Sequence, residues 1–263
     1  MSLLSGRELL EGSQRRAELV PLLELAEATL RTWEPHWSPL LDGALLEEAQ
    51  QRLGALSELA LGSWGGMEAA ERRRLLLQRQ EAIQPIESLD AGLQGLEISG
   101  NFLFDPIEPE DLRQALRASS AAEGELGDLW CRGDRGGQGI VTTDLATRLH
   151  GQTGQVRSVA VRFEARPISD LQLPPARLPK RLHSVEASLR LDAVGSAGFG
   201  ISRSRMADRI RQGAVRVNWQ VVTSPSRELA VGERVQLEGR GELTLESVAA
   251  TQRGRWRVGL LRR

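Results

Sequence analysis

Hydrophobic residues recur at helical spacing in the first third of the chain. The pattern occurs twice, at Leu19, Leu22, Leu23, Leu25 and Ala26 and again at Leu45, Leu46, Ala49, Leu53 and Leu56. Apolar residues three or four positions apart line one face of an amphipathic helix, so we expect two helices, separated at Pro35 and Pro39. A further helix is expected to begin near Glu68, after Gly65 and Gly66. The pattern therefore predicts a helical N-terminal domain over residues 1–85.

Strands and helices alternate between about Leu89 and Pro167. Strands are expected over residues 93–104, 126–132, 139–142 and 156–165, and helices over residues 110–118 and 144–150. In the last strand Val159, Val161 and Phe163 alternate with polar neighbours, as in a half-buried strand. The order strand, helix, strand, strand, helix, strand is that of a ferredoxin-like fold. We expect residues 86–167 to form such a domain.

A cluster of prolines follows this domain. The cluster consists of Pro167, Pro174, Pro175 and Pro179. Because proline fixes one backbone angle and lacks an N–H group, such a cluster favours an extended linker over packed structure. The sequence predicts a proline-rich linker over residues 168–182.

The remaining part, residues 183–263, combines two short helical patterns with strands. Ser202 directly precedes a helical run and suits its N-cap position, and Gly213 suits its C-terminal stop. The apolar side chains expected in the core are Met206, Ala207 and Ile210 in the helix and Val215 and Val217 in a strand. The whole chain is expected to be of the α+β class.

The composition is that of an ordinary folded protein, with 263 residues, 40% hydrophobic and 26% charged. No apolar run approaches the ~18 residues that a membrane span needs. Cys131 is the only cysteine, so an intrachain disulfide and a cysteine-based zinc site are excluded. The histidines, His36, His150 and His183, lie in three separate blocks. We expect no catalytic residue, no metal, no cofactor and a cytoplasmic location.

Charge is divided unequally along the chain. Residues 1–175 contain 17 basic and 27 acidic residues, a net charge of −10, whereas residues 176–263 contain 17 basic and 8 acidic residues, a net charge of +9. A basic C-terminal unit joined to an acidic body indicates a module that binds a polyanion, although a merely solvated basic surface is a comparable interpretation of charge alone.

The helical run after Ser202 concentrates arginine side chains, and guanidinium groups can contact two phosphate oxygens at once. Three arginines on one short helix exceed what solubility requires, and Arg216 in the following strand could extend the same surface. The RNA-binding residues expected from the sequence are Lys180, Arg181, Arg190, Ser202, Arg203, Arg205, Arg209, Arg211, Arg216 and Asn218.

This order of residues resembles the S4 RNA-binding domain. The resemblance rests on Arg190-Leu191-Asp192, Ser202-Arg203, Ala207 with Ile210, Gly213 to Asn218, Gly232-Glu233 and Gly239-Arg240-Gly241, over about 57 residues. It implies an αL-type S4 fold. We expect Asp192 to pair with a nearby arginine, and Gly213 and Gly232 to serve turns rather than RNA contact.

The first 170 residues are similar to S4 proteins of the YlmH type. The similarity lies in Gly65-Gly66 with Glu68, in Ala70-Glu71-Arg72 with Arg74, and in Leu126-Gly127-Asp128-Leu129. It implies a helical N-terminal part, a degenerate middle domain like the RNA recognition motif and a C-terminal S4 domain. It further implies binding of structured rRNA or tRNA on the large ribosomal subunit in translation quality control. Val185 to Ala193 resembles a cyanobacterial and plastid branch labelled photosystem II S4 domain protein.

Other functions are less well supported by the residues. An RNA-modifying enzyme with its site in the middle domain is one alternative, yet Arg190-Leu191-Asp192 is part of the S4 pattern and residues 132–139 lack the spacing of a nucleotide loop. An assembly factor for photosystem II acting through protein contacts is another. In the middle domain, Phe102 and Phe104 are expected to pack in the core rather than stack on bases.

Overall fold

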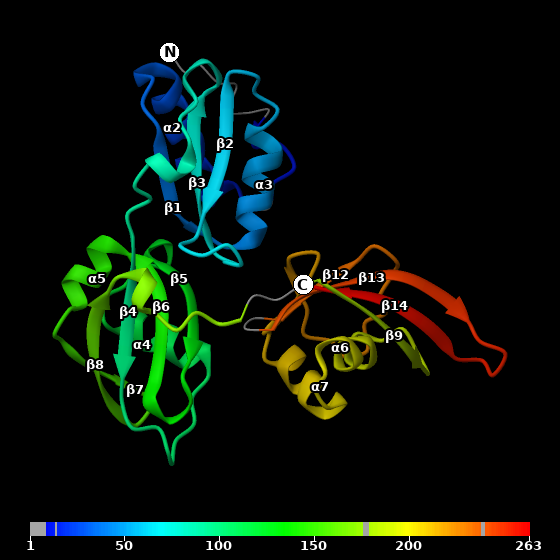
Figure 1. Ribbon diagram of the computed structural model, residues 1–263. Coiled ribbons are helices and arrows are strands. Elements are labelled where there is room, and N and C mark those ends of the chain that lie inside the picture. The colour runs from blue at the N-terminus through cyan, green and yellow to red at the C-terminus, as the bar shows by residue number, and fades with distance from the viewer. Residues whose placement is uncertain (1–8, 14, 176–178, 238–239) are drawn as a thin grey trace. The chain divides into compact units, whose positions relative to one another are not determined.

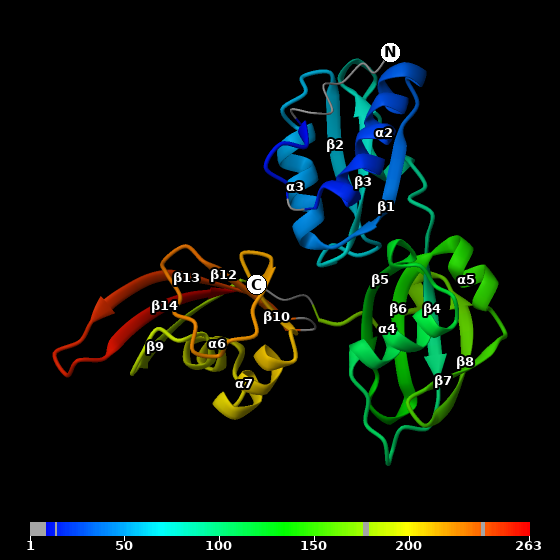
Figure 2. The ribbon, with the colours of Figure 1, turned by 180° about the vertical axis from the view of Figure 1, so that it is seen from behind.

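The computed structural model describes residues 9–13, 15–175, 179–237 and 240–263. The chain divides into two compact units, Met1–Pro174 and Pro175–Arg263, which Figures 1 and 2 show from opposite sides. Residues 176–178 of the expected linker and Gly239 of the S4 pattern lie outside the described residues. No helix in the described ranges combines the length and hydrophobicity that crossing a bilayer requires.

The first part of unit 1 consists of two helices packed on a small sheet, here called the N-terminal layer. Helices α2 (Arg16–Thr32) and α3 (Gly43–Leu53) pack on a sheet of order β1-β3-β2, with β1 at His36–Leu41, β2 at Leu59–Trp64 and β3 at Arg73–Arg79. Both helices expected from apolar spacing are confirmed, and Asp42 caps α3 by accepting the N–H of Leu45 at 2.9 Å. The N-terminal region is thus helical with a three-stranded sheet beside the helices.

The further helix expected to begin near Glu68 is wrong. Residues 73–79 form β3, which hydrogen-bonds to strands on both sides. Leu75, Leu76 and Leu77 are all fully buried, although successive side chains of a strand point to opposite faces. A run of adjacent apolar residues suits a central strand covered on both faces, whereas a surface helix would expose one of them.

The middle of unit 1 has the expected ferredoxin-like fold. Its sheet has the order β5-β6-β4-β8-β7, with β4 at Leu93–Ser99, β5 at Leu126–Cys131, β6 at Gly136–Thr142, β7 at Thr153–Val156 and β8 at Val159–Arg166. Helices α4 (Pro109–Ala118) and α5 (Thr143–Leu149) supply core residues against the sheet. Short 3-10 helices lie at Gln80–Ala82, Ile86–Ser88, Glu123–Glu125, Gly133–Arg135 and Ile168–Asp170.

Strand β4 is shorter than the sequence predicts and ends before both phenylalanines. Phe102 is buried at 1% exposure, as expected for a core residue, whereas Phe104 is 93% exposed. The expectation that both rings pack in the core is therefore wrong for Phe104. It lies in a surface loop because the chain leaves the sheet at Gly100.

Residues 168–172 are packed on the sheet, although the sequence predicts a linker there. Leu171 is buried, and the backbone N–H of Gln172 donates to the side chain of Gln138 on β6 at 2.9 Å. A Cβ placed on Gly66 would lie 2.9 Å from Ile140 and 3.1 Å from Ile168. Ile140 on β6 is fully buried, but it does not belong to the hydrophobic core that the sheet shares with α4 and α5. The central strands are therefore covered on the face where RNA recognition motifs stack bases.

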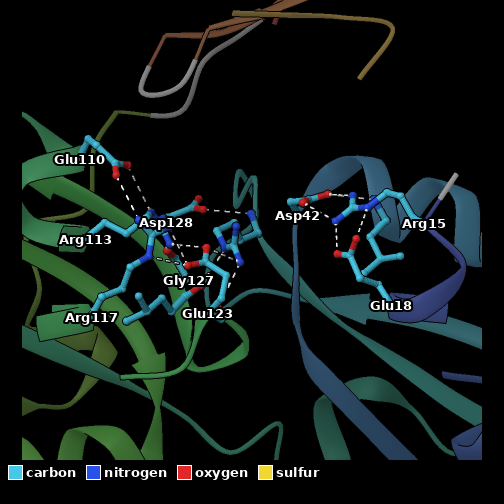
Figure 3. A network of polar contacts seen from close by, with 12 residues as sticks. Arg15, Glu18, Asp42, Glu110, Arg113, Arg117, Glu123, Gly127 and Asp128 are labelled. Carbon is cyan, nitrogen blue, oxygen red and sulfur yellow. Dashed lines mark hydrogen bonds and ion pairs between the residues drawn. The ribbon is translucent and has the colours of Figure 1, made fainter. Parts of the chain in front are cut away.

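Two of the segments on which the resemblance of the first 170 residues rests, around Arg72 and around Asp128, meet within unit 1. Asp128 on β5 accepts the backbone N–H groups of Glu71 at 2.7 Å and Arg72 at 2.9 Å, and the Arg72 side chain donates to the Leu126 carbonyl at 2.7 Å. Figure 3 shows Asp128 beside Arg113, which donates to the Gly127 carbonyl at 3.0 Å. These contacts join the N-terminal layer to the ferredoxin-like layer across more than fifty residues of sequence.

Unit 2 is a six-stranded antiparallel sheet with two helices on one face. The sheet order is β11-β10-β12-β13-β14-β9, with β9 at Lys180–Glu186, β10 at Val215–Val217, β11 at Gln220–Val221, β12 at Arg234–Leu237, β13 at Gly241–Ala250 and β14 at Trp256–Arg262. Helices α6 (Leu191–Phe199) and α7 (Arg203–Arg211) share one core with the sheet. Lys180 and Arg181 belong to β9 and not to a linker, because this strand pairs along its length with β14.

Candidate nucleic-acid interface

The first turn of α6 and the start of α7 are joined through Asp192. Its side chain is buried, at 5% exposure of the residue. Both carboxylate oxygens accept hydrogen bonds from the guanidinium groups of Arg190 and Arg203, each in a two-point contact with distances of 3.1 Å. The expectation that Asp192 pairs with an arginine is confirmed. Both arginines remain partly exposed, 38% for Arg190 and 53% for Arg203.

The charge state of Asp192 follows from these contacts. Burial raises the pKa of this carboxyl, but the hydrogen bonds and positive charges of Arg190 and Arg203 outweigh burial, so its pKa lies below the ordinary value. The group is ionised at neutral pH and orients both arginines. A guanidinium group carries five N–H donors, and the two that each arginine gives to Asp192 leave three for another anion.

Helix α7 carries its apolar and its basic side chains on different faces. The Ser202 hydroxyl accepts the backbone N–H of Arg205 at 3.3 Å, which confirms Ser202 as N-cap. The buried side chains are Met206, Ala207 and Ile210. At about 100° per residue, Arg205 and Arg209 lie about 40° apart on the helix, away from the centre of the apolar face. Arg211 lies on the other flank and pairs with Asp208 at 2.8 Å.

Arg216 does not share the surface of the α7 arginines. Val215 and Val217 on β10 are buried in the core that contains Met206 and Ile210, so the side chain between them points to the opposite face of the sheet. The expectation that Arg216 extends the surface of Arg203, Arg205 and Arg209 is wrong for this reason.

Asn218, Lys180 and Arg181 also lie apart from α7. Asn218 has a positive φ of 47° and binds Arg234 through its backbone N–H at 2.8 Å and its side-chain oxygen at 2.9 Å, so it shapes a turn. Lys180 and Arg181 lie on β9, four strands from β10, which is about 19 Å. Arg181 pairs with Glu246 at 3.1 Å. The ten predicted residues therefore do not form one surface, although six of them lie together at α6 and α7.

The arrangement agrees with known families. The family model "S4 domain" matches residues 189–235, and the family model "YlmH, N-terminal" matches residues 14–82. The ribosome-associated protein quality control protein P2 of Bacillus subtilis (strain 168) is 32% identical over 203 residues, which make up 77% of each chain.

The chain belongs to the YlmH family. The family resemblance noted in the sequence is thereby confirmed. The solved structure of the cell division protein ylmH from Streptococcus pneumoniae is similar over 58% of this chain and 93% of its own, with 17% identity and a TM-score of 0.44.

Sequence reasoning passed over one basic segment of this YlmH family member. Arg253, Arg255 and Arg257 surround the turn between β13 and β14. The signal was present in the sequence, because arginines alternate with other residues on either side of Gly254. These residues lie outside both matched segments.

Groups suited to metal or covalent chemistry are dispersed in this family member. Within the described ranges, no three His, Cys, Asp or Glu side chains come together in a way that could hold a metal ion. Cys131 is half-buried and its thiol donates to the Ile107 carbonyl at 3.4 Å. Burial raises the pKa of the Cys131 thiol to about 11, so the reactive thiolate is scarce at neutral pH.

Proposed function

We propose that this chain binds structured rRNA or tRNA through its C-terminal S4 domain, in the cytoplasm and on the large ribosomal subunit, as part of translation quality control. The observation that carries the proposal is the Asp192 carboxylate, which fixes Arg190 and Arg203 at the junction of α6 and α7. The name of the B. subtilis relative supplies the ribosomal setting.

The geometry of α6 and α7 favours contact with a phosphate backbone. Arg203 is held at the first turn of α7 with part of its guanidinium exposed, and Arg205 and Arg209 follow on the outward side of the same helix. Holding a guanidinium in place before binding reduces the entropy lost on binding. Phosphate contacts position a protein on RNA without reading its sequence, so we expect structured RNAs of different sequence to be bound.

The two units are proposed to have different roles. Unit 2 carries the positive net charge, and unit 1 the negative net charge, which disfavours an RNA surface there. In unit 1 the central strands of the ferredoxin-like sheet are covered by residues 168–172 and by Gly66. We propose that residues 1–85 and 86–167 act as two domains that position the protein or contact a protein partner.

The salt dependence of RNA binding by the full chain tests this proposal. Four phosphate contacts would give a slope of about −3 to −4 in a plot of log affinity against log salt. Arg205→Gln with Arg209→Gln is expected to weaken binding of tRNA and rRNA fragments and to reduce that slope by about 2. Arg16→Gln with Arg31→Gln, which removes the same charge from unit 1, serves as the control. Affinity that stays constant between about 50 and about 300 mM salt would overturn the proposal.

The proposal includes no chemical step. RNA incubated with the protein, with and without common cofactors, is expected to keep its mass. A reproducible new modification found by mass spectrometry would favour the alternative of an RNA-modifying enzyme with its site in the middle domain. Recovery of photosystem II subunits but no RNA with the protein from cells would favour the alternative of an assembly factor.

A further inference from the structure

The hairpin formed by β13 and β14 has a turn of defined geometry. The Thr251 hydroxyl accepts the backbone N–H of Arg255 at 3.1 Å and donates to the carbonyl of Arg255 at 3.0 Å. The backbone N–H of Gly254 donates to the Thr251 carbonyl at 3.1 Å, and Gly254 has the positive φ of 67° that this turn needs. The turn therefore holds Arg253 and Arg255 at fixed places on the backbone.

Three arginines of this hairpin have no acidic partner in the described part of the chain. Arg253, Arg255 and Arg257 are all exposed, and none of their side chains forms an ion pair or hydrogen bond with another described residue. They differ in this from Arg181 and Arg211, whose guanidinium groups are paired with carboxylates. Three adjacent cations repel one another, so an anionic ligand would be stabilised among them.

The hairpin also contains a hollow with an apolar floor. Arg257 on β14 lies directly opposite Ala249 on β13 and Val185 on β9, so these three side chains share one face of the sheet. Val185 is 48% exposed. The hollow has a volume of about 770 Å³ and is lined by Val185, Ala249, Ala250, Thr251, Gln252, Arg253, Arg255 and Arg257. Its size lies in the range of small-molecule sites.

This face lies opposite the helices that carry the proposed S4 contacts. Along β14, Val258 and Leu260 are buried in the core beneath α6 and α7, so Arg257 points to the other side. The hollow is thus distinct from the surface of Arg205 and Arg209, and it lies beyond residues 189–235, which match the S4 family.

We infer that this hollow is a second RNA site, which takes an unpaired segment of an RNA whose structured part is bound at α6 and α7. The arginines would contact successive phosphates, and the apolar side chains of Val185 and Ala249 would contact the face of a base. A paired stem offers no free base face, so the floor would favour unpaired nucleotides. This inference rests on the proposed function.

The test compares two RNAs of equal length with the full chain. One is a stem with about eight unpaired nucleotides, and the other is a blunt duplex. Arg253→Gln, Arg255→Gln and Arg257→Gln together are expected to lower affinity for the first RNA about tenfold at about 150 mM salt and to reduce the salt slope by about 2 to 3. Affinity for the duplex is expected to change less than twofold. The thermal midpoint should stay the same because the three side chains are exposed.

Two further variants control for charge and for the floor of the hollow. Arg16→Gln, Arg31→Gln and Arg135→Gln remove the same charge from exposed positions of unit 1 and are expected to leave both affinities unchanged. Val185→Asp places a carboxylate on the floor and is expected to weaken binding of the unpaired RNA. The isosteric Val185→Thr is expected to bind the unpaired RNA with the affinity of the wild type.

The outcomes separate this inference from the proposed function. Normal binding by the hairpin variant, together with loss of binding by Arg205→Gln with Arg209→Gln, would overturn the second site alone. An equal loss for stem and duplex RNAs would overturn the preference for unpaired nucleotides. Tighter binding of polyglutamate than of the unpaired RNA at matched charge, dependent on the three arginines, would overturn the RNA assignment and assign the hollow to an acidic protein. A wild-type chain that binds neither RNA would overturn both proposals.

Discussion

Arg203, the first residue of α7, makes a two-point contact at 3.1 Å with the carboxylate of Asp192 on the first turn of α6. The same carboxylate holds Arg190 in the same manner. A single buried acid thus links the first turns of two helices and holds two cations in place. We therefore expect substitution of Asp192 to affect both stability and the proposed RNA contact.

Asp192→Asn is expected to lower the free energy of unfolding by about 1–2 kcal/mol, because it removes charge-assisted hydrogen bonds to two arginines that are themselves partly exposed. The measurement is chemical unfolding of the full chain at neutral pH. Asp208→Asn is the matched control, since Asp208 is exposed and pairs with the exposed Arg211. The control should change stability by no more than about 0.5 kcal/mol. Equal effects of the two variants would contradict a structural role for Asp192.

The contribution of Asp192 should depend on pH. Although burial raises the pKa of this carboxyl, the arginines lower it below the ordinary value of 3.8, so the unfolded chain binds this proton more readily than the folded chain. The stabilisation is then fully present above about pH 5 and is lost as the pH falls through the lowered folded value. The difference in unfolding free energy between wild type and Asp192→Asn isolates this group. A difference that grows on acidification would contradict the assignment.

Two changes on α7 should have opposite effects. Arg205→Gln with Arg209→Gln is expected to weaken RNA binding while changing stability by no more than about 0.5 kcal/mol, because both side chains lie outside the apolar face. Ile210→Ala should cost about 2–5 kcal/mol, because Ile210 is fully buried and its removal leaves a cavity. Thermal unfolding and RNA titration of both variants provide the measurement. Unfolding of the arginine variant at the temperature of Ile210→Ala would show that the helix faces are assigned wrongly.

Asp128 should stabilise the junction within unit 1. Asp128→Ala leaves the backbone N–H groups of Glu71 and Arg72 without their acceptor, and such a loss costs about 1–3 kcal/mol. Asp128→Asn keeps one oxygen acceptor and is expected to fall between wild type and Asp128→Ala. Asp134→Ala removes an exposed acid in the 3-10 helix Gly133–Arg135 and serves as the control in the same denaturant titration. An Asp128→Ala variant as stable as the control would show that the junction does not depend on this carboxylate.

Features that depend on residues close together in the chain could be predicted from the sequence. Helices α2 and α3 follow from apolar spacing, and the start of α7 follows from Ser202, whose hydroxyl reaches a backbone N–H only three residues away. The order of strands and helices was sufficient to predict the ferredoxin-like layer, because short connections restrict the topology. The S4 pattern was readable because its turn glycines, cap and apolar positions lie within a short segment.

The pairing of distant segments, and the face that each side chain occupies, depend on contacts between residues far apart in the sequence. The apolar run around Leu76 suits either a helix or a buried strand. It forms a strand because β1 and β2 hydrogen-bond to it on both sides. Arg216 points away from α7 because its neighbours Val215 and Val217 are buried against that helix. Val185, Ala249 and Arg257 come together only through strand pairing across more than sixty residues. Strand register is set by burial against distant partners, and a local pattern does not contain those partners.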